Sequence, residues 1–326
     1  MENSLILPRP LRGEGRGEGD ILTLYYYMED GLMGSESMDK PKMLREIIAS
    51  PGIHVGPGVY DCLGAKIVEN FGFELVFTSG FGISGSTLGR PDYGYLTATE
   101  MLYTVGRIAK SVSIPLIADA DTGYGNPLNV MRTVSDIVPL GVAGIILEDQ
   151  QWPKKCGHFE GKRLIAKAEH VEKIHAAVEA RGDSGLVIIG RTDALAPFGI
   201  DEAIDRGRAY FEAGADVIFI EAPQSVEDLK AIVESFPDAP LFANMVEGGK
   251  TPFLSAPELA QMGYKLVAYP LSGLFSAVAA MTTCLSHLKE HGTSTGAPVE
   301  MLDFKKYENL IDLEHYKGLE LKFKTE

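Results

Sequence analysis

The chain is poor in cysteine, with only Cys62, Cys156 and Cys284 among its 326 residues. These three lie too far apart for a zinc knuckle or a disulfide framework, so we expect a reducing compartment such as the cytoplasm. Long apolar runs are also lacking, because none approaches the roughly 20 residues that span a bilayer. The sequence therefore argues against a disulfide scaffold and against a membrane protein.

Basic residues are outnumbered, with 30 Lys and Arg against 45 Asp and Glu and a formal net charge of −15. Nucleic-acid binding requires clustered Lys and Arg, so we expect no nucleic-acid partner. No G-x-G-x-x-G fingerprint follows the first strand-like segment, which weakens a dinucleotide-binding interpretation. Hydrophobic residues make up 45% of the chain and suffice for one large core.

The first 40 residues differ from the rest of the chain. Residues 11–19 read LRGEGRGEG, a low-complexity stretch that cannot build a core. We expect residues 1–40 to be a disordered or partner-docking extension, unless translation begins at Met28, Met33 or Met38. Residues 41–326 are expected to form a single domain.

Short apolar segments alternate with amphipathic helical patterns along residues 41–326. This alternation predicts βαβ units, and eight of them in a chain of this length predict a (β/α)8 barrel followed by C-terminal helices. Such a barrel places its active site at the carboxyl ends of the strands. The strand-like segments are Ile53–Val59, Leu75–Ser79, Ile114–Ala118, Gly144–Leu147, Leu186–Gly190, Val217–Ile220, Leu241–Ala243 and Lys265–Tyr269, and the C-terminal helical patterns are Ala277–His291, Leu302–Leu310 and Leu313–Lys322.

The segment Lys154-Lys155-Cys156-Gly157-His158 surrounds a thiol with cationic side chains. Neighbouring cations lower the pKa of a cysteine, so Cys156 is expected to exchange a proton near neutral pH. Gly157 suggests a backbone that bends or moves, as in a loop that closes over a substrate. A solvated basic loop with an incidental cysteine is the alternative interpretation of this segment.

Acidic side chains stand at the ends of two apolar segments. Asp119 and Asp121 follow one of them, and Glu148 ends another. Alternate residues of a strand point the same way, so Asp119 and Asp121 are expected to face one side. Mg²⁺ is commonly held by one or two carboxylates together with waters and substrate, so the group predicts a Mg²⁺ site. Each acid taken alone is also compatible with helix capping.

These motifs, together with Ser79-Gly80 and Leu88-Gly89-Arg90-Pro91-Asp92, resemble the isocitrate lyase / phosphoenolpyruvate mutase superfamily from about residue 40 to about residue 320. The cysteine loop is typical of its carbon–carbon lyases. The chain looks most like the short members, which include 2-methylisocitrate lyase, 2,3-dimethylmalate lyase, oxaloacetate hydrolase and the petal death protein. Carboxyphosphonoenolpyruvate mutase has a similar loop, so P–C bond chemistry is the alternative function. A non-catalytic barrel would be expected to lack intact metal acids.

The resemblance implies a metal-dependent reaction, in which Mg²⁺ (or Mn²⁺) assists cleavage of a 2-hydroxy di- or tricarboxylate. The products would be a 2-keto acid, or oxalate, and a carboxylate. Asp119 would be the most direct metal ligand, and Asp121 and Glu148 would act largely through metal-bound waters. Asp92 would belong to the same acidic network.

Catalytic roles follow from the same resemblance. Cys156 would protonate the departing aci-carboxylate, while Lys154, Lys155 and His158 would lower its pKa or steady the anion. Glu221 would pair with His158. The base that takes the C2 hydroxyl proton stays open among Tyr60, Glu148 acting through a water, and a metal-bound hydroxide.

Substrate-binding roles are implied for Arg191, for the backbone of Ser79 and Gly80, and for the pocket positions Asn244, Gly157 and Pro270. Arg191 would grip the keto-acid end, and its alternative role is an internal salt bridge with Asp193 or Glu221.

Two positions bear on the choice of substrate. Relatives that cleave methylisocitrate carry a hydroxyl residue where this chain has Val246, and oxaloacetate hydrolases need a serine where it has Pro270 followed by Leu271 and Ser272. Both departures favour an alkyl-substituted malate such as 2,3-dimethylmalate, with methylisocitrate and oxaloacetate as alternatives. Members of the family exchange the eighth helix between subunits and form dimers of dimers, so the resemblance also implies a homotetramer.

Overall fold

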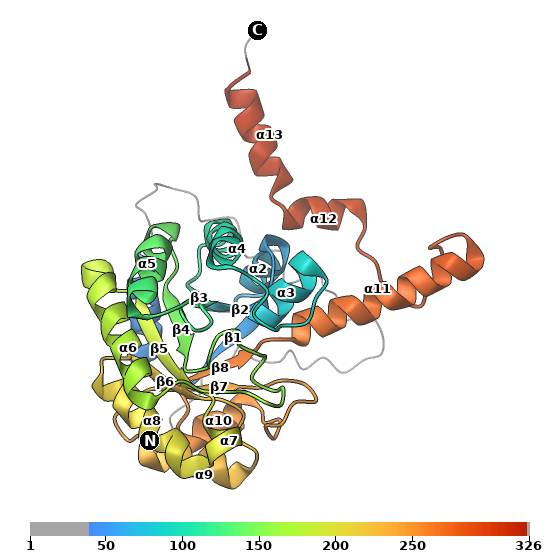
Figure 1. Ribbon diagram of the computed structural model, residues 1–326. Coiled ribbons are helices and arrows are strands. Elements are labelled where there is room, and N and C mark those ends of the chain that lie inside the picture. The colour runs from blue at the N-terminus through green and yellow to red at the C-terminus, as the bar shows by residue number, and fades with distance from the viewer. Residues whose placement is uncertain (1–38, 325–326) are drawn as a thin grey trace, which may run out of the picture. The chain divides into compact units, whose positions relative to one another are not determined.

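The computed structural model describes residues 39–324, which contain a closed barrel of eight parallel strands in sequential order (Figure 1). Each strand pairs with the next, and β1 pairs with β8 to close the ring. The expected (β/α)8 fold is confirmed, whereas the expectation for the N-terminal extension falls on residues 1–38, outside the described part. The strands are β1 (His54–Val59), β2 (Val76–Thr78), β3 (Leu116–Asp119), β4 (Gly144–Glu148), β5 (Val187–Thr192), β6 (Val217–Ile220), β7 (Leu241–Asn244) and β8 (Leu266–Tyr269).

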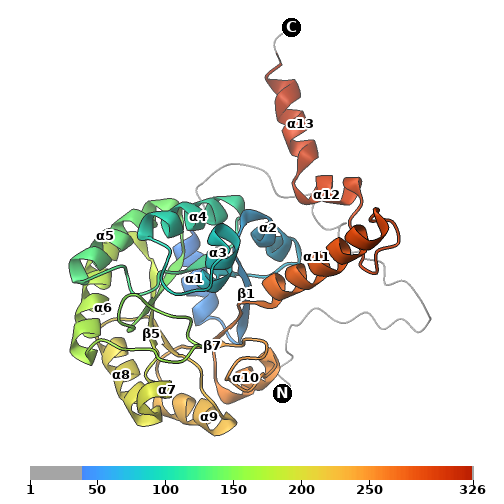
Figure 2. The ribbon, with the colours of Figure 1, turned by 45° about the vertical axis from the view of Figure 1, so that its right-hand side comes forward.

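Helices connect the strands and form an outer layer around the barrel (Figure 2). Most begin at a residue whose side chain caps the first turn: Thr97, Asn126 and Ser225, for example, each form a capping box. The helices of this layer are α2 (Cys62–Asn70), α3 (Gly80–Leu88), α4 (Ala98–Ser111), α5 (Pro127–Ile137), α6 (Lys167–Arg181), α7 (Leu195–Phe198), α8 (Ile200–Glu212), α9 (Val226–Ser235) and α10 (Ala256–Met262).

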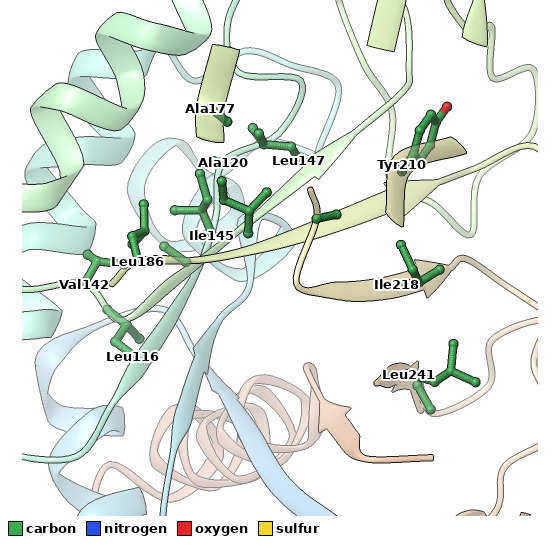
Figure 3. Close-up of a cluster of buried hydrophobic side chains, with 14 of the residues drawn as sticks. Leu116, Ala120, Val142, Ile145, Leu147, Ala177, Leu186, Tyr210, Ile218 and Leu241 are labelled. Atoms are coloured by element: carbon green, nitrogen blue, oxygen red, sulfur yellow. The ribbon is translucent and has the colours of Figure 1, made fainter. Parts of the chain in front are cut away.

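Two apolar layers follow from the alternation of side chains along the strands. One set points into the barrel, with Ile146 of β4, Ile189 of β5 and Phe219 of β6 among its members. The other set points outward against the helices, as Ile145 and Leu147 do (Figure 3). Residues buried on both faces explain why these strands are continuous apolar runs in the sequence.

Helix α1 (Lys40–Ala49) closes the amino-terminal end of the barrel. Its Leu44 is fully buried among the inward-facing residues. A side chain on Gly144 would place its Cβ 2.9 Å from Leu44 Cδ2, so glycine makes room for this plug. With one end filled, only the carboxyl end of the strands is left to form a site.

After β8 the chain enters α11 (Ser272–His291), which extends away from the barrel in both ribbon views (Figures 1 and 2). It has no buried residue in the described chain. Two shorter helices, α12 (Phe304–Leu310) and α13 (Leu313–Lys322), follow it. Within residues 39–324, no helix combines the length and apolarity needed to cross a membrane.

Candidate active site

Polar residues stand at the next inward position beyond the apolar interior of the barrel. Inward-facing Ile117, Ile146, Ile189, Phe219 and Phe242 are each followed two residues later by a polar side chain. Alternation directs those side chains to the same side as the interior residues, so they gather at the carboxyl end of the barrel. They are Asp119 on β3, Glu148 on β4, Arg191 on β5, Glu221 just after β6 and Asn244 on β7.

A pocket of about 470 Å³, including the part open to solvent, lies among these side chains. Most of the residues singled out from the sequence line it. Asp121 and Glu148 are buried but do not line it, and neither do Lys155 and Tyr60. Val246, Leu271, Phe77 and Phe81 add apolar surface. The sequence-predicted lining residues are Ser79, Gly80, Asp92, Asp119, Lys154, Cys156, Gly157, His158, Arg191, Glu221, Asn244 and Pro270.

Lys154 lies in an acidic cluster rather than beside the thiol. Its Nζ is 2.6 Å from Asp121 Oδ1 and 2.8 Å from Asp92 Oδ2. Burial alone would lower the pKa of Lys154, but the surrounding carboxylates outweigh it and raise that pKa well above its usual value. The main partners of Lys154 are therefore these aspartates, and its lowering of the Cys156 pKa is only a smaller contribution to that pKa.

The carboxylates of this cluster outnumber the one lysine among them. Burial, and then repulsion from Asp119 and Asp92, raises the pKa of Asp121 to about 6 despite the ion pair with Lys154. Burial likewise raises the pKa of Glu148 well above its usual range. Both shifts arise first from withdrawal of the carboxyl groups from water, and repulsion from neighbouring carboxylates adds a smaller contribution.

A hard cation fits this cluster. Glu148 Oε1 is buried without a hydrogen-bond partner among the described residues, and Asp119 lines the pocket. In residues 39–324 no three His, Cys, Asp or Glu side chains converge as a ready ligand set. That agrees with a Mg²⁺ ion held by one or two carboxylates and otherwise by waters and substrate, and not with a closed all-protein cage.

The environment of Cys156 corrects the expected direction of its pKa. Burial raises the pKa of the thiol to about 11, and the hydrogen bond from the His158 backbone lowers it less. Asp92 and Glu221 raise it further, whereas Lys154 lowers it. A raised pKa favours the protonated thiol at neutral pH, which suits a proton donor.

Gly157 is needed for a close approach rather than for a hinge. A Cβ at this position would lie 2.5 Å from Arg191 Nη2 and 2.7 Å from Glu221 Cγ. The loop that carries Cys156 consequently lies against the pocket wall. Gly161, later in the same loop, has a left-handed backbone with φ +70°.

Arg191 is held by carboxylates on two of its nitrogen atoms. Nε and Nη2 donate to Asp193 at 2.9 and 3.1 Å, and Nη2 also lies 3.0 Å from Glu221 Oε2 and 3.3 Å from Glu148 Oε2. The internal salt bridge considered as an alternative is thus present. Because Arg191 also lines the pocket, its remaining Nη1 is the group left for a substrate carboxylate.

His158, Glu221 and Asn244 form a connected polar wall. Nδ1 of His158 accepts from the Lys250 N–H at 3.1 Å, so the ring proton lies on Nε2, which faces Glu221 Oε1 at 3.3 Å. Asn244 Nδ2 is 3.4 Å from both oxygens of Glu221. Asn244 Oδ1 is buried with no partner among the described residues, so it can accept a hydrogen bond from a ligand.

The backbone at Ser79 and Gly80 serves the site differently from the expectation. The Ser79 N–H donates to Val59 O at 3.0 Å, and the Ser79 hydroxyl caps α3 by accepting from Gly82. The Gly80 N–H is only weakly engaged, at 3.3 Å from Asp119 Oδ2. Gly80, at the amino terminus of α3, is therefore the backbone donor left for a carboxylate, and Ser79 supports that turn.

Buried ionic residues beneath the pocket were missed by sequence reasoning. Asp149 Oδ2 accepts from Tyr210 at 2.7 Å and Arg206 at 3.0 Å, while Oδ1 accepts from the Asp193 N–H at 2.9 Å. Lys162 pairs with Asp193 at 2.9 Å. The alternation of β4 offered one signal, because Glu148 pointing inward requires Asp149 to point outward toward the helices.

Comparisons with known proteins identify the family of this chain. A family model described as phosphoenolpyruvate phosphomutase matches residues 44–289. The 2,3-dimethylmalate lyase of Eubacterium barkeri is 44% identical over 288 residues, covering 88% of this chain and 99% of that protein. A chloroplastic carboxyvinyl-carboxyphosphonate phosphorylmutase of Arabidopsis thaliana is 43% identical over 281 residues, covering 85% of this chain and 83% of the relative.

A solved structure of oxaloacetate acetylhydrolase in complex with the inhibitor 3,3-difluorooxalacetate also matches. It has a TM-score of 0.84 and 35% identity, and the match covers 87% of this chain and 97% of that one. The chain therefore belongs to the phosphoenolpyruvate mutase/isocitrate lyase superfamily, as an enzyme of its oxo-acid lyase type.

Proposed function

We propose that this enzyme cleaves the C2–C3 bond of an alkyl-substituted 2-hydroxy dicarboxylate, of the 2,3-dimethylmalate type, with the help of Mg²⁺. The observation that carries the proposal is a single pocket lined by Cys156, Arg191 and Asp119 together with apolar Val246 and Leu271. Cys156, Arg191 and Asp119 suit the binding of charged groups and the transfer of a proton. Val246 and Leu271 suit an alkyl substituent rather than a further carboxylate.

The metal belongs with Asp119, which lines the pocket, and with the buried Asp121, Glu148 and Asp92 around it. When bound there, Mg²⁺ (or Mn²⁺) would supply Lewis-acid stabilisation of the negative charge that develops on the substrate oxygens. The gathering of these carboxylates around Lys154 and the unpartnered Glu148 Oε1 support this assignment.

The protein's own groups account for orientation and for one proton. Arg191 and the Gly80 N–H orient the substrate carboxylates. Once the C2 hydroxyl has lost its proton, the electrons of the C2–C3 bond pass to the departing fragment, leaving a 2-keto acid and an aci-carboxylate. The Cys156 Sγ–H then gives its proton to the carbon of that fragment, and the loop excludes water that would protonate it without control.

The apolar side of the pocket supports the choice of substrate. Val246 is buried and lines the pocket, so a third carboxylate facing it would lose a hydrogen bond, at a cost of about 1–3 kcal/mol. The Ser272 hydroxyl, which could have served an oxaloacetate-type substrate, instead donates to Glu247 and does not line the pocket.

Helix α11 supports a proposed assembly by helix exchange into a homotetramer. Phe275, Val278, Met281, Leu285 and Leu288 recur at helical spacing, and each is at least 40% exposed. A barrel normally covers its eighth strand with the helix that follows it, yet α11 extends away. We propose that this stripe packs on the barrel of a second copy, and that the enzyme is cytoplasmic.

The substrate proposal is tested with the full-length protein and a panel of acids. The panel contains 2,3-dimethylmalate, 2-methylisocitrate, oxaloacetate and phosphonopyruvate, each assayed for keto-acid, oxalate or phosphate release with Mg²⁺ and with EDTA. We expect 2,3-dimethylmalate to give the highest kcat/KM and EDTA to abolish turnover. Turnover of phosphonopyruvate alone would replace carbon–carbon cleavage with phosphorus chemistry.

A pocket variant sharpens the same test. Val246→Ser should raise kcat/KM for 2-methylisocitrate relative to 2,3-dimethylmalate by about 10-fold, since it restores one hydrogen bond to a carboxylate. Ser86→Val, on an exposed face of α3, is a matched control that should leave the ratio unchanged. An unchanged ratio in Val246→Ser would show that Val246 does not select the substrate.

A further inference from the structure

Lys162 is a buried lysine in the loop after β4, and the chemistry proposed above does not use it. Its side chain is only 2% exposed. The ammonium donates to the carbonyl oxygen of Gly157 and, at 2.9 Å, to Asp193 Oδ1. A charge withdrawn from water requires such partners, and both of these belong to parts of the active site.

Asp193 connects Lys162 to Arg191. The oxygen that accepts from Lys162 also accepts from Arg191 Nη2 at 3.1 Å, and the other oxygen accepts from Arg191 Nε at 2.9 Å. Asp193 is fully buried, and its N–H is fixed by Asp149 at 2.9 Å. The carboxylate therefore cannot shift toward or away from Lys162 without turning the guanidinium of Arg191.

The loop is fixed at its base and packed against the barrel farther along. Gln150 and Leu164 form an antiparallel bridge, and the Gln151 N–H donates to Arg163 O at 2.7 Å. Lys162 stands beside this base. Gly157, next to Cys156, accepts the hydrogen bond from Lys162 through its carbonyl oxygen. At this point the loop packs so closely over Arg191 and Glu221 that a Cβ on Gly157 would clash.

We propose that Lys162 is a positioning residue that ties the Cys156 loop to the carboxylate supporting Arg191, so that the thiol and the guanidinium are set in place together. The consequence for catalysis rests on the proposed function. The contact itself is tested without substrate, by measuring how accessible Cys156 is.

The experiment follows iodoacetamide alkylation of each cysteine in the full-length protein by mass spectrometry. In Lys162→Met, Cys156 should be alkylated about tenfold faster or more, the change expected when a charged hydrogen bond holding a loop is lost. Cys62 serves as the internal reference and should keep its rate. Arg163→Met, an exposed neighbour in the same segment, should behave like the wild type. Unchanged alkylation of Cys156 in folded Lys162→Met overturns the proposal.

A second variant covers the case in which Lys162→Met does not fold. Lys162→Met/Asp193→Asn removes both charges of the pair, and Arg191, which also pairs with Asp193, keeps its ion pairs with Glu148 and Glu221. Fast alkylation of Cys156 in this folded variant supports the proposal, and a wild-type rate contradicts it. A purely structural role would instead accelerate Cys62 and Cys156 alike.

The catalytic consequence is measured separately. With an active substrate, Lys162→Met should lower kcat by about 10²-fold with little change in KM, because misplacement of catalytic groups acts mainly on the chemical step. A kcat equal to that of the wild type would overturn the coupling. Failure of the wild type to cleave any substrate in the panel would reject the proposed function and leave the alkylation result to decide the role of Lys162.

Discussion

Oδ1 of Asp121 lies 2.6 Å from Nζ of Lys154, and the two side chains are 4% and 5% exposed. The pair lies within a group of carboxylates that includes Asp92, Asp119 and Glu148. Lys154 is thus a cation that offsets the negative charge at the acidic end of the pocket. Substitution of Lys154 should therefore affect the stability of the fold more directly than it affects catalysis.

Lys154→Met should destabilise the fold by about 3–5 kcal/mol, the usual effect of removing one partner from a buried ion pair. Urea unfolding measures the change. Added Mg²⁺ should restore part of the loss, because a cation bound among the same carboxylates replaces the missing charge. An unfolding free energy equal to that of the wild type would show that the cluster does not depend on Lys154.

Asp119→Ala should abolish activity and remove the rise in Tm that Mg²⁺ produces in the wild type, since a ligand that binds only the folded state stabilises it. Asp136→Ala is the matched control, because Asp136 forms a surface pair with Arg132 and is about half exposed, at 49%. Full activity of the wild type after verified metal removal would contradict the metal assignment.

Cys156→Ser should lower kcat by about 10²–10⁴, the range for a lost proton donor, while KM changes little. The fold should be retained, because serine is nearly isosteric with cysteine. Steady-state kinetics with the best substrate of the panel measures both constants. Wild-type turnover in this variant would remove the thiol from the mechanism.

The buried thiol also predicts a dependence of stability on pH. Burial raises the pKa of Cys156 from 9.0 to about 11, so the folded protein keeps a proton that the unfolded chain releases. The stabilising contribution is complete below pH 9 and is lost as the pH rises to about 11. At ~1.4 kcal/mol for each unit, it amounts to about 2–3 kcal/mol.

Unfolding free energies measured below pH 9 and near pH 11 test this relation. The wild type should lose more stability across that interval than Cys156→Ser, in which serine does not titrate. Equal losses in the two proteins would mean that the thiol is solvated in the folded state.

Gly157→Ala should lower kcat by about 10²-fold, because its Cβ would lie 2.5 Å from Arg191 Nη2 and prevent the loop from packing. Global stability should change little, since a surface loop can move outward. Gly85→Ala is the control: that glycine lies on an exposed face of α3 with nothing within 4 Å of an added Cβ. Wild-type kinetics in Gly157→Ala would show that the packed position is not required.

Met281→Asp should dissociate the proposed assembly, because it places a charge in the middle of the apolar stripe of α11. Met281 is 61% exposed in the isolated chain. Sedimentation velocity should show a smaller species than the wild type. Thr283→Asp, on the opposite side of the helix, is the control. A wild-type protein that sediments as a monomer would refute helix exchange.

The barrel was predictable from the sequence because each strand is marked by its own short apolar segment. Most strands are apolar runs buried on both faces, and the predicted and observed ends differ by at most two residues. Helix α3 gave no such signal: Gly80, Gly82 and Gly85 oppose helix formation, and packing with the Ser79 cap overrides them. Local composition therefore identified strands better than it identified this helix.

The site was predictable in membership but not in its contacts. Strand alternation brings Asp119, Arg191 and Glu221 to one end whatever their partners are. The pairing of charged groups depends on tertiary structure. Lys154 lies two residues from Cys156 in the sequence, yet it pairs with Asp92 and Asp121 in other segments. For the same reason the sequence did not indicate a role for Lys162, whose partner Asp193 lies 31 residues away in the sequence.

The two ends of the pocket are built by different parts of the barrel. Groups suited to charge and proton transfer come mainly from β3 to β6 and the loop after β4, whereas Asn244, Val246, Pro270 and Leu271 come from β7, β8 and the segments after them. Exchanging the segments that follow β7 and β8 would alter which acid fits the pocket. The reacting groups would stay in place. Under the proposed function, substrate preference and reacting groups are thus carried by separate segments of the chain, and substitutions in one set do not require changes in the other.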